Sequence, residues 1–281
     1  MTAEVDMRTI QRALVALTIL LAPVAFAGEG IAFITNLKGE VAVDGNPRPP
    51  ILSELGKGQK IAVGKESQAS VMYIATGKEY LLRGPGEYVV TNTEISASNG
   101  MPPVTRNTEW RASNKVLVQV AQSSAASVRM RSISHVRTEP ARVAFPSRGN
   151  VATLQPTFRW PAPVPKSEFT LIVAGQDKPV HTAKPTGNTY RVPAKLKPDT
   201  EYSWAVTAGT SEVGSGRFRT LPSEAIDQVE KRKPADKAEF SDRVLYALML
   251  LELGAAQEAQ EAWARLAQER ADLPELAALA K

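Results

Sequence analysis

Short runs of alternating hydrophobic and polar residues fill the chain between residues 28 and 100. Four of these runs lie at positions 39–43, 67–74, 79–82 and 87–90. Turn-forming triplets separate them, namely Asp44-Gly45-Asn46, Thr76-Gly77-Lys78 and Gly84-Pro85-Gly86. Alternation with a period of two residues, interrupted by glycine and proline, predicts an all-β unit over residues 28–100.

The same pattern returns between residues 143 and 221. Its runs lie at positions 155–160, 168–173, 188–192, 201–206 and 217–219. In the first of them, Phe158 and Trp160 are two residues apart and would therefore share one face of a strand. We expect a second all-β unit, a sandwich, over residues 143–221.

Residues 109–133 contain neither glycine nor proline, and apolar residues recur there at helical spacings of three, four and seven. This periodicity predicts a helix inside a basic connecting segment, residues 101–142. Two interpretations are open. The helix docks on a partner through its basic residues, or it covers an open face or edge of the first β unit while its charges stay in water.

Residues 222–281 are predicted to form a helical hairpin. Apolar residues at helical spacing begin at Phe240, after a charged linker at 231–237, and end at a glycine stop, Gly254. Two more helices are expected over 255–270 and 273–280. The fold class is therefore mostly β with α. Because the linker is short, we expect the hairpin to pack within the chain, against the sandwich; packing on another chain is the alternative.

Residues 1–27 have the pattern of a secretory signal peptide. Arg8 and Arg12 precede an apolar run at 13–22, and the small-residue site Ala25-Phe26-Ala27 follows. The run is shorter than the ~20 residues that span a bilayer, and no later stretch is apolar enough to do so. We expect translation to start at Met1 or Met7, cleavage between Ala27 and Gly28, and a periplasmic mature protein. An ordinary amphipathic first helix is the alternative.

Positive charge is concentrated in one part of the chain. Residues 101–150 hold eight arginines and lysines against two glutamates, a local charge of +6, whereas the whole chain carries +5. Such a segment attracts anionic partners through its long-range field. In a periplasm these are membrane headgroups, acidic polysaccharide or acidic proteins, and nucleic acid is not expected. The candidate partner-binding residues are Arg106, Trp110, Arg111, Lys115, Arg129, Arg131 and Arg137.

Glycines and strand hydrophobics give the first β unit a family resemblance. The residues that carry it are Gly39-Glu40-Val41, Leu55-Gly56-Lys57-Gly58-Gln59-Lys60-Ile61, Gly64, Gln68-Ala69-Ser70-Val71 and Gly84-Pro85-Gly86-Glu87-Tyr88. Over about 70 residues this segment resembles the periplasmic FecR domain. The resemblance implies a β fold. Regulators of sigma factors in that family carry a cytoplasmic helical domain and a membrane span, and this chain has at most 12 residues before its apolar run.

Two further resemblances concern the rest of the chain. The L-x-P-x-T-x-Y corner motif is present as Leu196-Lys197-Pro198-Asp199-Thr200-Glu201-Tyr202. Trp160 matches the buried tryptophan that the same family carries on an early strand. Residues 143–221 thus resemble a fibronectin type III module, which implies that the Tyr202 hydroxyl pins the crossover between two sheets. Leu253-Gly254, Glu258-Ala259 and Trp263 resemble part of one tetratricopeptide unit, whereas a solenoid needs about three repeats.

Residue patterns for catalysis are missing. The chain has no cysteine and only two histidines, His135 and His181, which no nearby residue pairs. It contains no H-x-x-x-H pair, calcium loop, nucleophile elbow or Walker loop. We therefore expect no enzymatic activity, no cofactor and no metal.

The expected function is non-catalytic: a periplasmic binding or scaffold protein of the cell envelope, acting through protein–protein contacts or envelope signalling. The alternative is a module that binds peptidoglycan or an acidic glycan, which needs an exposed aromatic beside basic residues. Trp110 next to Arg111 is the place in the sequence that offers one. A hydrolase is the third possibility, and it would need polar residues from separate strands to converge in a cleft.

Overall fold

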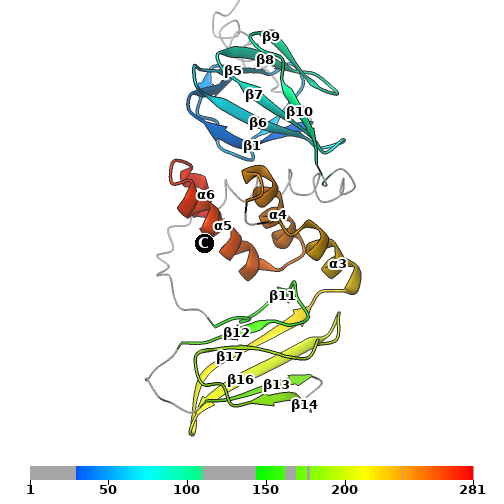
Figure 1. Ribbon diagram of the computed structural model, residues 1–281, viewed down its shortest axis with the longest axis vertical. Helices are drawn as coiled ribbons and strands as arrows, with labels where there is room; N and C mark the ends of the chain where they lie inside the picture. Colours follow the sequence, from blue (N-terminus) through cyan, green and yellow to red (C-terminus); the bar gives the residue numbers. More distant parts are fainter. Residues whose placement is uncertain are drawn as a thin grey trace, which may run out of the picture.

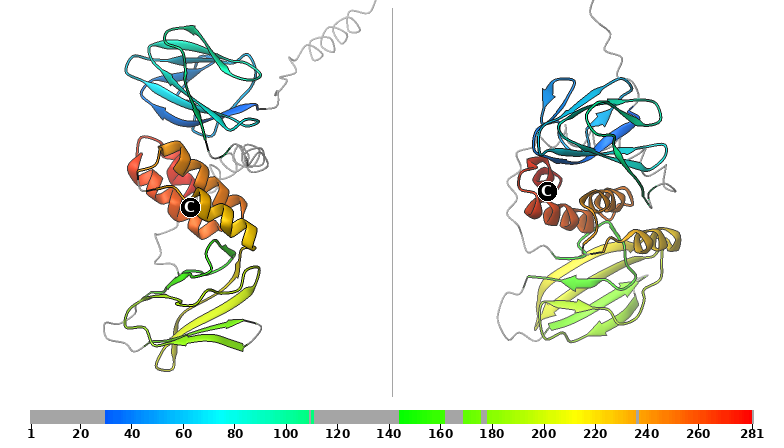
Figure 2. Two further views of the ribbon diagram at one scale, coloured as in Figure 1. Left: turned by 45° about the vertical axis from the view of Figure 1, so that its right-hand side comes forward. Right: turned by 45° about the horizontal axis from the view of Figure 1, so that its top comes forward.

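Three structural units lie in a row in the computed structural model of the chain. The structure describes residues 30–108, 110, 144–161, 169–175, 178–235 and 237–280, with the side chains of 169–172 and 175 left out. The first β unit (30–108) and the second β unit (144–221) occupy the two ends, and the helical unit (222–280) lies between them (Figures 1 and 2). The order in space therefore differs from the order along the chain.

The first β unit consists of two antiparallel five-stranded sheets. Its strands are β1 (Ala32–Lys38), β2 (Val41–Val43), β3 (Asn46–Pro47), β4 (Glu54–Leu55), β5 (Lys60–Val63), β6 (Gln68–Tyr73), β7 (Lys78–Arg83), β8 (Gly86–Val90), β9 (Ile95–Asn99) and β10 (Val104–Asn107). One sheet has the order β10-β7-β6-β1-β4 and the other β3-β2-β5-β8-β9. The four runs predicted here correspond to β2, β6, β7 and β8, and these strands are confirmed.

One boundary of this unit was predicted wrongly. β10 pairs with β7 along Val104 to Asn107, so the β unit continues past residue 100 into the segment that was expected to be a linker. The sequence signal there is weak because Val104 and Thr105 are exposed and no buried residue alternates with them. An edge strand held mainly by backbone hydrogen bonds leaves little trace in the hydrophobic pattern.

The second β unit contains one five-stranded sheet and one two-stranded sheet. Its strands are β11 (Asn150–Val151), β12 (Thr157–Arg159), β13 (Phe169–Gly175), β14 (Lys178–Ala183), β15 (Thr189–Arg191), β16 (Glu201–Ala208) and β17 (Ser211–Thr220). The orders are β11-β17-β16-β13-β14 and β12-β15. Phe158 and Trp160 are both buried and both pack near Trp204, so the prediction that they share one face is confirmed.

Four helices form the helical unit. They are α3 (Ser223–Arg232), α4 (Phe240–Glu252), α5 (Ala256–Glu269) and α6 (Pro274–Leu279). α4 stops at the predicted glycine: Gly254 has φ +74°, and the N–H groups of Gly254 and Ala255 donate to the carbonyls of Leu251 and Leu250. These two bonds form a Schellman motif. α3 runs two residues into the segment 231–237 that was predicted to be a linker.

The helices share their apolar core with the first β unit. Buried side chains of α4, α5 and α6 form one continuous cluster with those of β1, β6 and β7, whereas the second β unit has its own core around Phe158, Trp160 and Trp204. The prediction that the hairpin packs within the chain is confirmed. Its apolar face lies on the first β unit, however, and not on the sandwich, where it was expected. The prediction of a mostly β fold with α-helices is confirmed.

Candidate functional site

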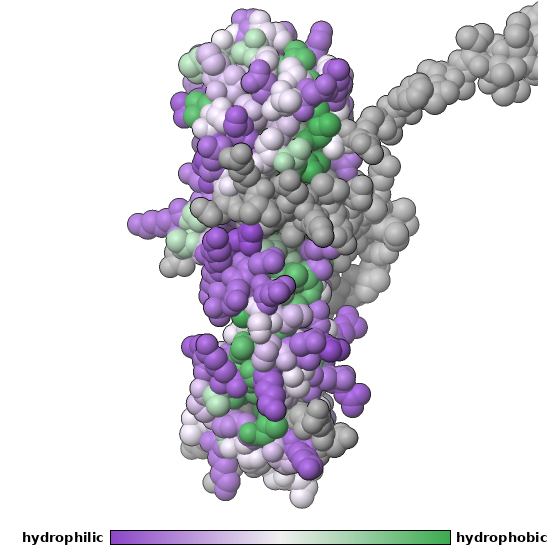
Figure 3. Space-filling model, turned by 90° about the vertical axis from the view of Figure 1, so that its right-hand side faces the viewer, coloured by the Kyte–Doolittle hydropathy of each residue, from purple (hydrophilic) through white to green (hydrophobic). Residues whose placement is uncertain are grey.

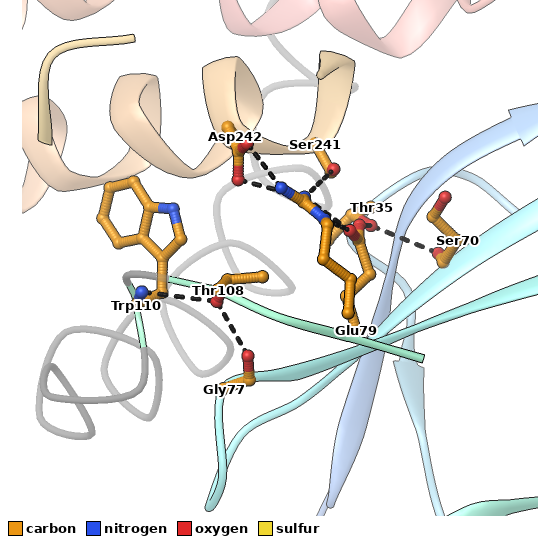
Figure 4. A network of polar contacts seen from close by, with 9 residues as sticks. Thr35, Ser70, Gly77, Glu79, Thr108, Trp110, Ser241 and Asp242 are labelled. Carbon is orange, nitrogen blue, oxygen red and sulfur yellow. Dashed lines mark hydrogen bonds and ion pairs between the residues drawn. The ribbon is translucent and has the colours of Figure 1, made fainter. Parts of the chain in front are cut away.

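Arg106, the first candidate residue, joins the first β unit to the helical unit. From β10 its Nε donates to Oε2 of Glu79 on β7 at 2.8 Å, and its Nη1 donates to Oδ2 of Asp242 on α4 at 2.7 Å. Its Nη2 also donates to Oγ of Ser241 at 3.1 Å. Figure 4 shows two of these partners, Ser241 and Asp242, on the helix and the third, Glu79, on the strands. Arg106 thus serves a contact inside the chain.

The environment of this guanidinium favours its charged form. Glu79 is 5% exposed, and its Oε1 lies 3.1 Å from the hydroxyl of Thr35 on β1 (Figure 4). Burial lowers the pKa of Arg106, but the hydrogen bond to Asp242 and the negative charge of Glu79 outweigh it, and the pKa is raised. Arg106 therefore compensates the charge of a buried carboxylate, which would be costly to leave alone.

Trp110 is buried as well. It is 2% exposed and belongs to the core shared by the first β unit and the helices. Its backbone N–H donates to Oγ1 of Thr108, and the guanidinium of Arg232 on α3 lies 5.7 Å from its ring centroid. A buried ring offers no face to a sugar, so Trp110 does not supply the exposed aromatic that glycan binding needs.

The remaining predicted site residues lie outside the described residues. These are Arg111, Lys115, Arg129, Arg131 and Arg137, together with Ala27 and Gly28 and most of the helix predicted at 109–133. His135 also lies outside them. His181 on β14 is described, and its Nε2 lies 2.9 Å from the hydroxyl of Tyr190. No nucleophile–base–acid constellation forms around His181 within the described part of the chain.

Two more side chains of the helical unit hold the first β unit, and the sequence gives no local signal for either. Arg270 follows α5, and its guanidinium donates to the carbonyl oxygen of Leu37 and to Oδ1 of Asn36. Glu275 on α6 accepts the backbone N–H of Ile51 at 2.9 Å. Together with Arg106 and the shared core, they fix the helices on this unit.

The contact between the helical unit and the second β unit combines hydrogen bonds with apolar packing, since Ala152 and Leu221 belong to the core cluster of the helices. Oε1 of Gln257 accepts the N–H of Ser147 at 2.7 Å, and the carbonyl of Gly254 accepts the N–H of Asn150 at 3.1 Å. Oε1 of Glu258 accepts the N–H of Ala152 at 2.9 Å. Interfaces between units of one chain resemble transient protein–protein interfaces more than domain cores.

A groove of about 600 Å³ opens beside this contact. One wall is α5, and the other is formed by Phe145 and by the ends of β12 and β15. Arg159 crosses the groove wall to form an ion pair with Glu261, and its guanidinium lies 4.7 Å from the ring centroid of Phe145. The other polar lining residues are Asn188, Thr189, Gln257, Gln260 and Arg265. Glu261 is the one carboxylate among the described lining residues, so they include no pair of carboxylates for acid–base chemistry.

The described surface has no large apolar patch on the face shown in Figure 3. Hydrophobic residues are scattered there among hydrophilic ones. Within the described ranges, no three histidines, cysteines or acidic residues are grouped so that they could hold a metal ion. None of the helices described is both long and apolar enough to cross a membrane.

Comparison with known proteins adds no family. No protein-family model matches the chain, and no curated protein is similar enough in sequence to count as a relative.

Proposed function

We propose that this chain is a non-catalytic scaffold of the bacterial cell envelope that presents two β units to protein partners. One observation carries the proposal: the helical unit contacts both β units and holds them at opposite ends of one molecule (Figure 1). A spacer of this kind sets the distance and orientation between two binding surfaces.

The periplasmic setting is part of the proposal. Its support is the sequence of residues 1–27, with a basic start, a short apolar run and the site before Gly28. The FecR-like pattern of the first β unit and the fibronectin-like corner of the second are in keeping with an envelope protein. The hydrogen bond from the Lys197 N–H to the Tyr202 hydroxyl supports the second resemblance.

One of the proposed partner contacts is the basic segment 101–142, which joins the two β units along the chain. Since Arg106 and Trp110 serve internal contacts, the residues to test are Arg129, Arg131 and Arg137. Positive charge gathered in one segment favours an acidic surface on the partner and a contact that weakens with salt.

An acidic glycan is the second candidate ligand, and the groove beside α5 is the observation that favours it. The groove combines the exposed amide of Asn188 with the exposed guanidinium of Arg265. These two groups can donate hydrogen bonds to the hydroxyl and carboxylate oxygens of a glycan.

Crosslinking of the tagged protein in its native host, followed by mass spectrometry, tests the proposal. We expect one dominant envelope protein with the wild type and its loss when Arg129, Arg131 and Arg137 are all replaced by serine. A variant with Arg83, Arg191 and Arg217 replaced by serine removes the same charge from exposed positions elsewhere and should keep the partner. Failure to recover any reproducible envelope protein would contradict the proposal.

The glycan candidate is tested by pelleting the protein with purified sacculi at low and high salt. Binding at low salt that Arg265→Ala weakens would support the groove as its site. Equal amounts of protein in the supernatant with and without sacculi at low salt would exclude peptidoglycan as the ligand.

A further inference from the structure

Glu258 occupies an unusual place in the contact between α5 and the second β unit. Its Oε1 accepts the backbone N–H of Ala152 at 2.9 Å, just after β11. Its Oε2 is shielded from solvent and has no hydrogen-bond partner in the structure. A carboxylate in such a position loses hydration without full compensation, whereas a neutral carboxyl group loses much less.

The charged and titratable groups that face Glu258 come from three elements. Glu261 on α5 disfavours a second negative charge, and Arg159 on β12 favours one. Tyr246 on α4 also faces this carboxyl, and the positive charge of Arg265 on α5 acts to lower the pKa of Tyr246. Burial raises the pKa of Glu258 to about 7, because it outweighs the hydrogen bond from Ala152. The carboxyl therefore titrates near neutral pH.

The backbone segment that Glu258 holds is connected on both sides. Toward the helices, the N–H groups of Asn150 and Ala152 donate to Gly254 and Glu258. Toward the sandwich, the carbonyls of Gly149 and Val151 accept from residues 219 and 221 at the end of β17. Breaking the hydrogen bonds from this segment to the helices would leave its hydrogen bonds to the end of β17 intact. The segment can therefore act as a joint.

We propose that the contact between α5 and residues 147–152 is a pH-sensitive joint, closed when the Glu258 carboxyl is protonated and opened when it ionises. The first β unit and the helices share a core and move together. The second β unit is held by hydrogen bonds, of which one depends on Glu258, and by the apolar side chains of Ala152 and Leu221. Raising the pH therefore loosens the second β unit from the rest of the molecule, whichever partner the protein binds.

The direction and size of the effect follow from linkage. In the closed joint the pKa of Glu258 is raised from its ordinary value of 4.5 to about 7. The closed state is therefore favoured at low pH and loses stability as the pH rises from 4.5 to about 7. If opening returns Glu258 to water, the opening equilibrium constant should rise roughly thirtyfold between pH 5.5 and pH 8. Above the raised pKa the effect levels off.

Amide hydrogen exchange of the full chain, followed by NMR and corrected for the intrinsic pH dependence of exchange, tests the joint. We expect the protection of the Asn150 and Ala152 amides to fall roughly thirtyfold from pH 5.5 to pH 8. The amides of Arg219 and Leu221, which bind the same segment from the sandwich side, should change less than about threefold and serve as the internal control.

Glu258→Gln is the matched variant, since glutamine keeps an acceptor for the Ala152 N–H and has no charge to gain. Its joint amides should show protection that does not vary with pH. Three results would overturn the proposal: constant protection of Asn150 and Ala152 in the wild type, an equal fall in Glu258→Gln, or a parallel fall at Arg219 and Leu221. The wild-type comparison decides the matter even where the variant folds poorly.

Discussion

Arg106 and Asp242 lie 136 residues apart in the chain, yet Nη1 of the arginine donates to Oδ2 of the aspartate at 2.7 Å. The same guanidinium binds the buried Glu79. The pair connects the last strand of the first β unit to the first turn of α4, beside the apolar core that the two units share. A residue that the sequence suggested for partner binding therefore holds the molecule together.

Removing this guanidinium should destabilise the protein strongly. Arg106→Ala leaves Glu79 buried without its cation and should lower the free energy of unfolding by about 2 to 4 kcal/mol in urea titrations. Adding Glu79→Gln should recover part of the loss, because the uncompensated charge is then gone. Arg219→Ala is the control: its pair with Asp199 is more than half exposed and should contribute less than about 1 kcal/mol. Equal losses for Arg106→Ala and Arg219→Ala would contradict this role.

The Tyr202 hydroxyl accepts the N–H of Lys197 at 2.9 Å, as the corner motif predicts. Tyr202 is 4% exposed, so Tyr202→Phe leaves this N–H without its partner. We expect a loss of about 1 to 3 kcal/mol in the stability of the second β unit, measured by thermal unfolding. Tyr190→Phe removes a half-buried hydroxyl that faces His181 and should change the stability by less than about 0.5 kcal/mol. An unchanged melting temperature for Tyr202→Phe would refute the role of the corner.

Gly84 lies against the backbone of the neighbouring sheet. A Cβ atom at this position would lie 1.7 Å from the carbonyl oxygen of Gly64, so the backbone must shift to accept any side chain. Gly84→Ala should cost about 3 kcal/mol or prevent folding. At Gly56 a Cβ atom would meet nothing within 4 Å, and Gly56→Ala should be neutral or slightly stabilising. Circular dichroism during urea unfolding distinguishes the two variants, and similar midpoints would contradict the close approach.

Arg270 should matter for holding α5 on the first β unit. Its side chain is 17% exposed, donates to Asn36 and Leu37, and lies over the ring of Phe240. Arg270→Ala should lower the free energy of unfolding by about 1 to 3 kcal/mol. Arg265→Ala removes an exposed arginine from the same helix and should have an effect below about 0.5 kcal/mol. Chemical denaturation of both variants provides the measurement, and indistinguishable curves would speak against the contact.

The local elements of this protein could be predicted from its sequence. Alternation predicted β6, β7 and β8, helical spacing predicted α4 and α5, and Gly254 marked the end of α4. These features depend on residues a few positions apart, which the periods of strands and helices make visible.

Which surfaces pack against each other could not be predicted from the sequence and became clear from the folded chain. The apolar stripe of α4 does not indicate whether it packs on the first or the second β unit. β10 shows no alternation of apolar and polar residues because both of its faces are largely polar. Arg106, Arg270 and Glu258 owe their roles to partners more than 100 residues away. Periodicity depends on neighbours in the sequence, whereas burial depends on the second surface that covers a residue. A site made of buried charges can therefore be recognised only when the packing of the two surfaces is known.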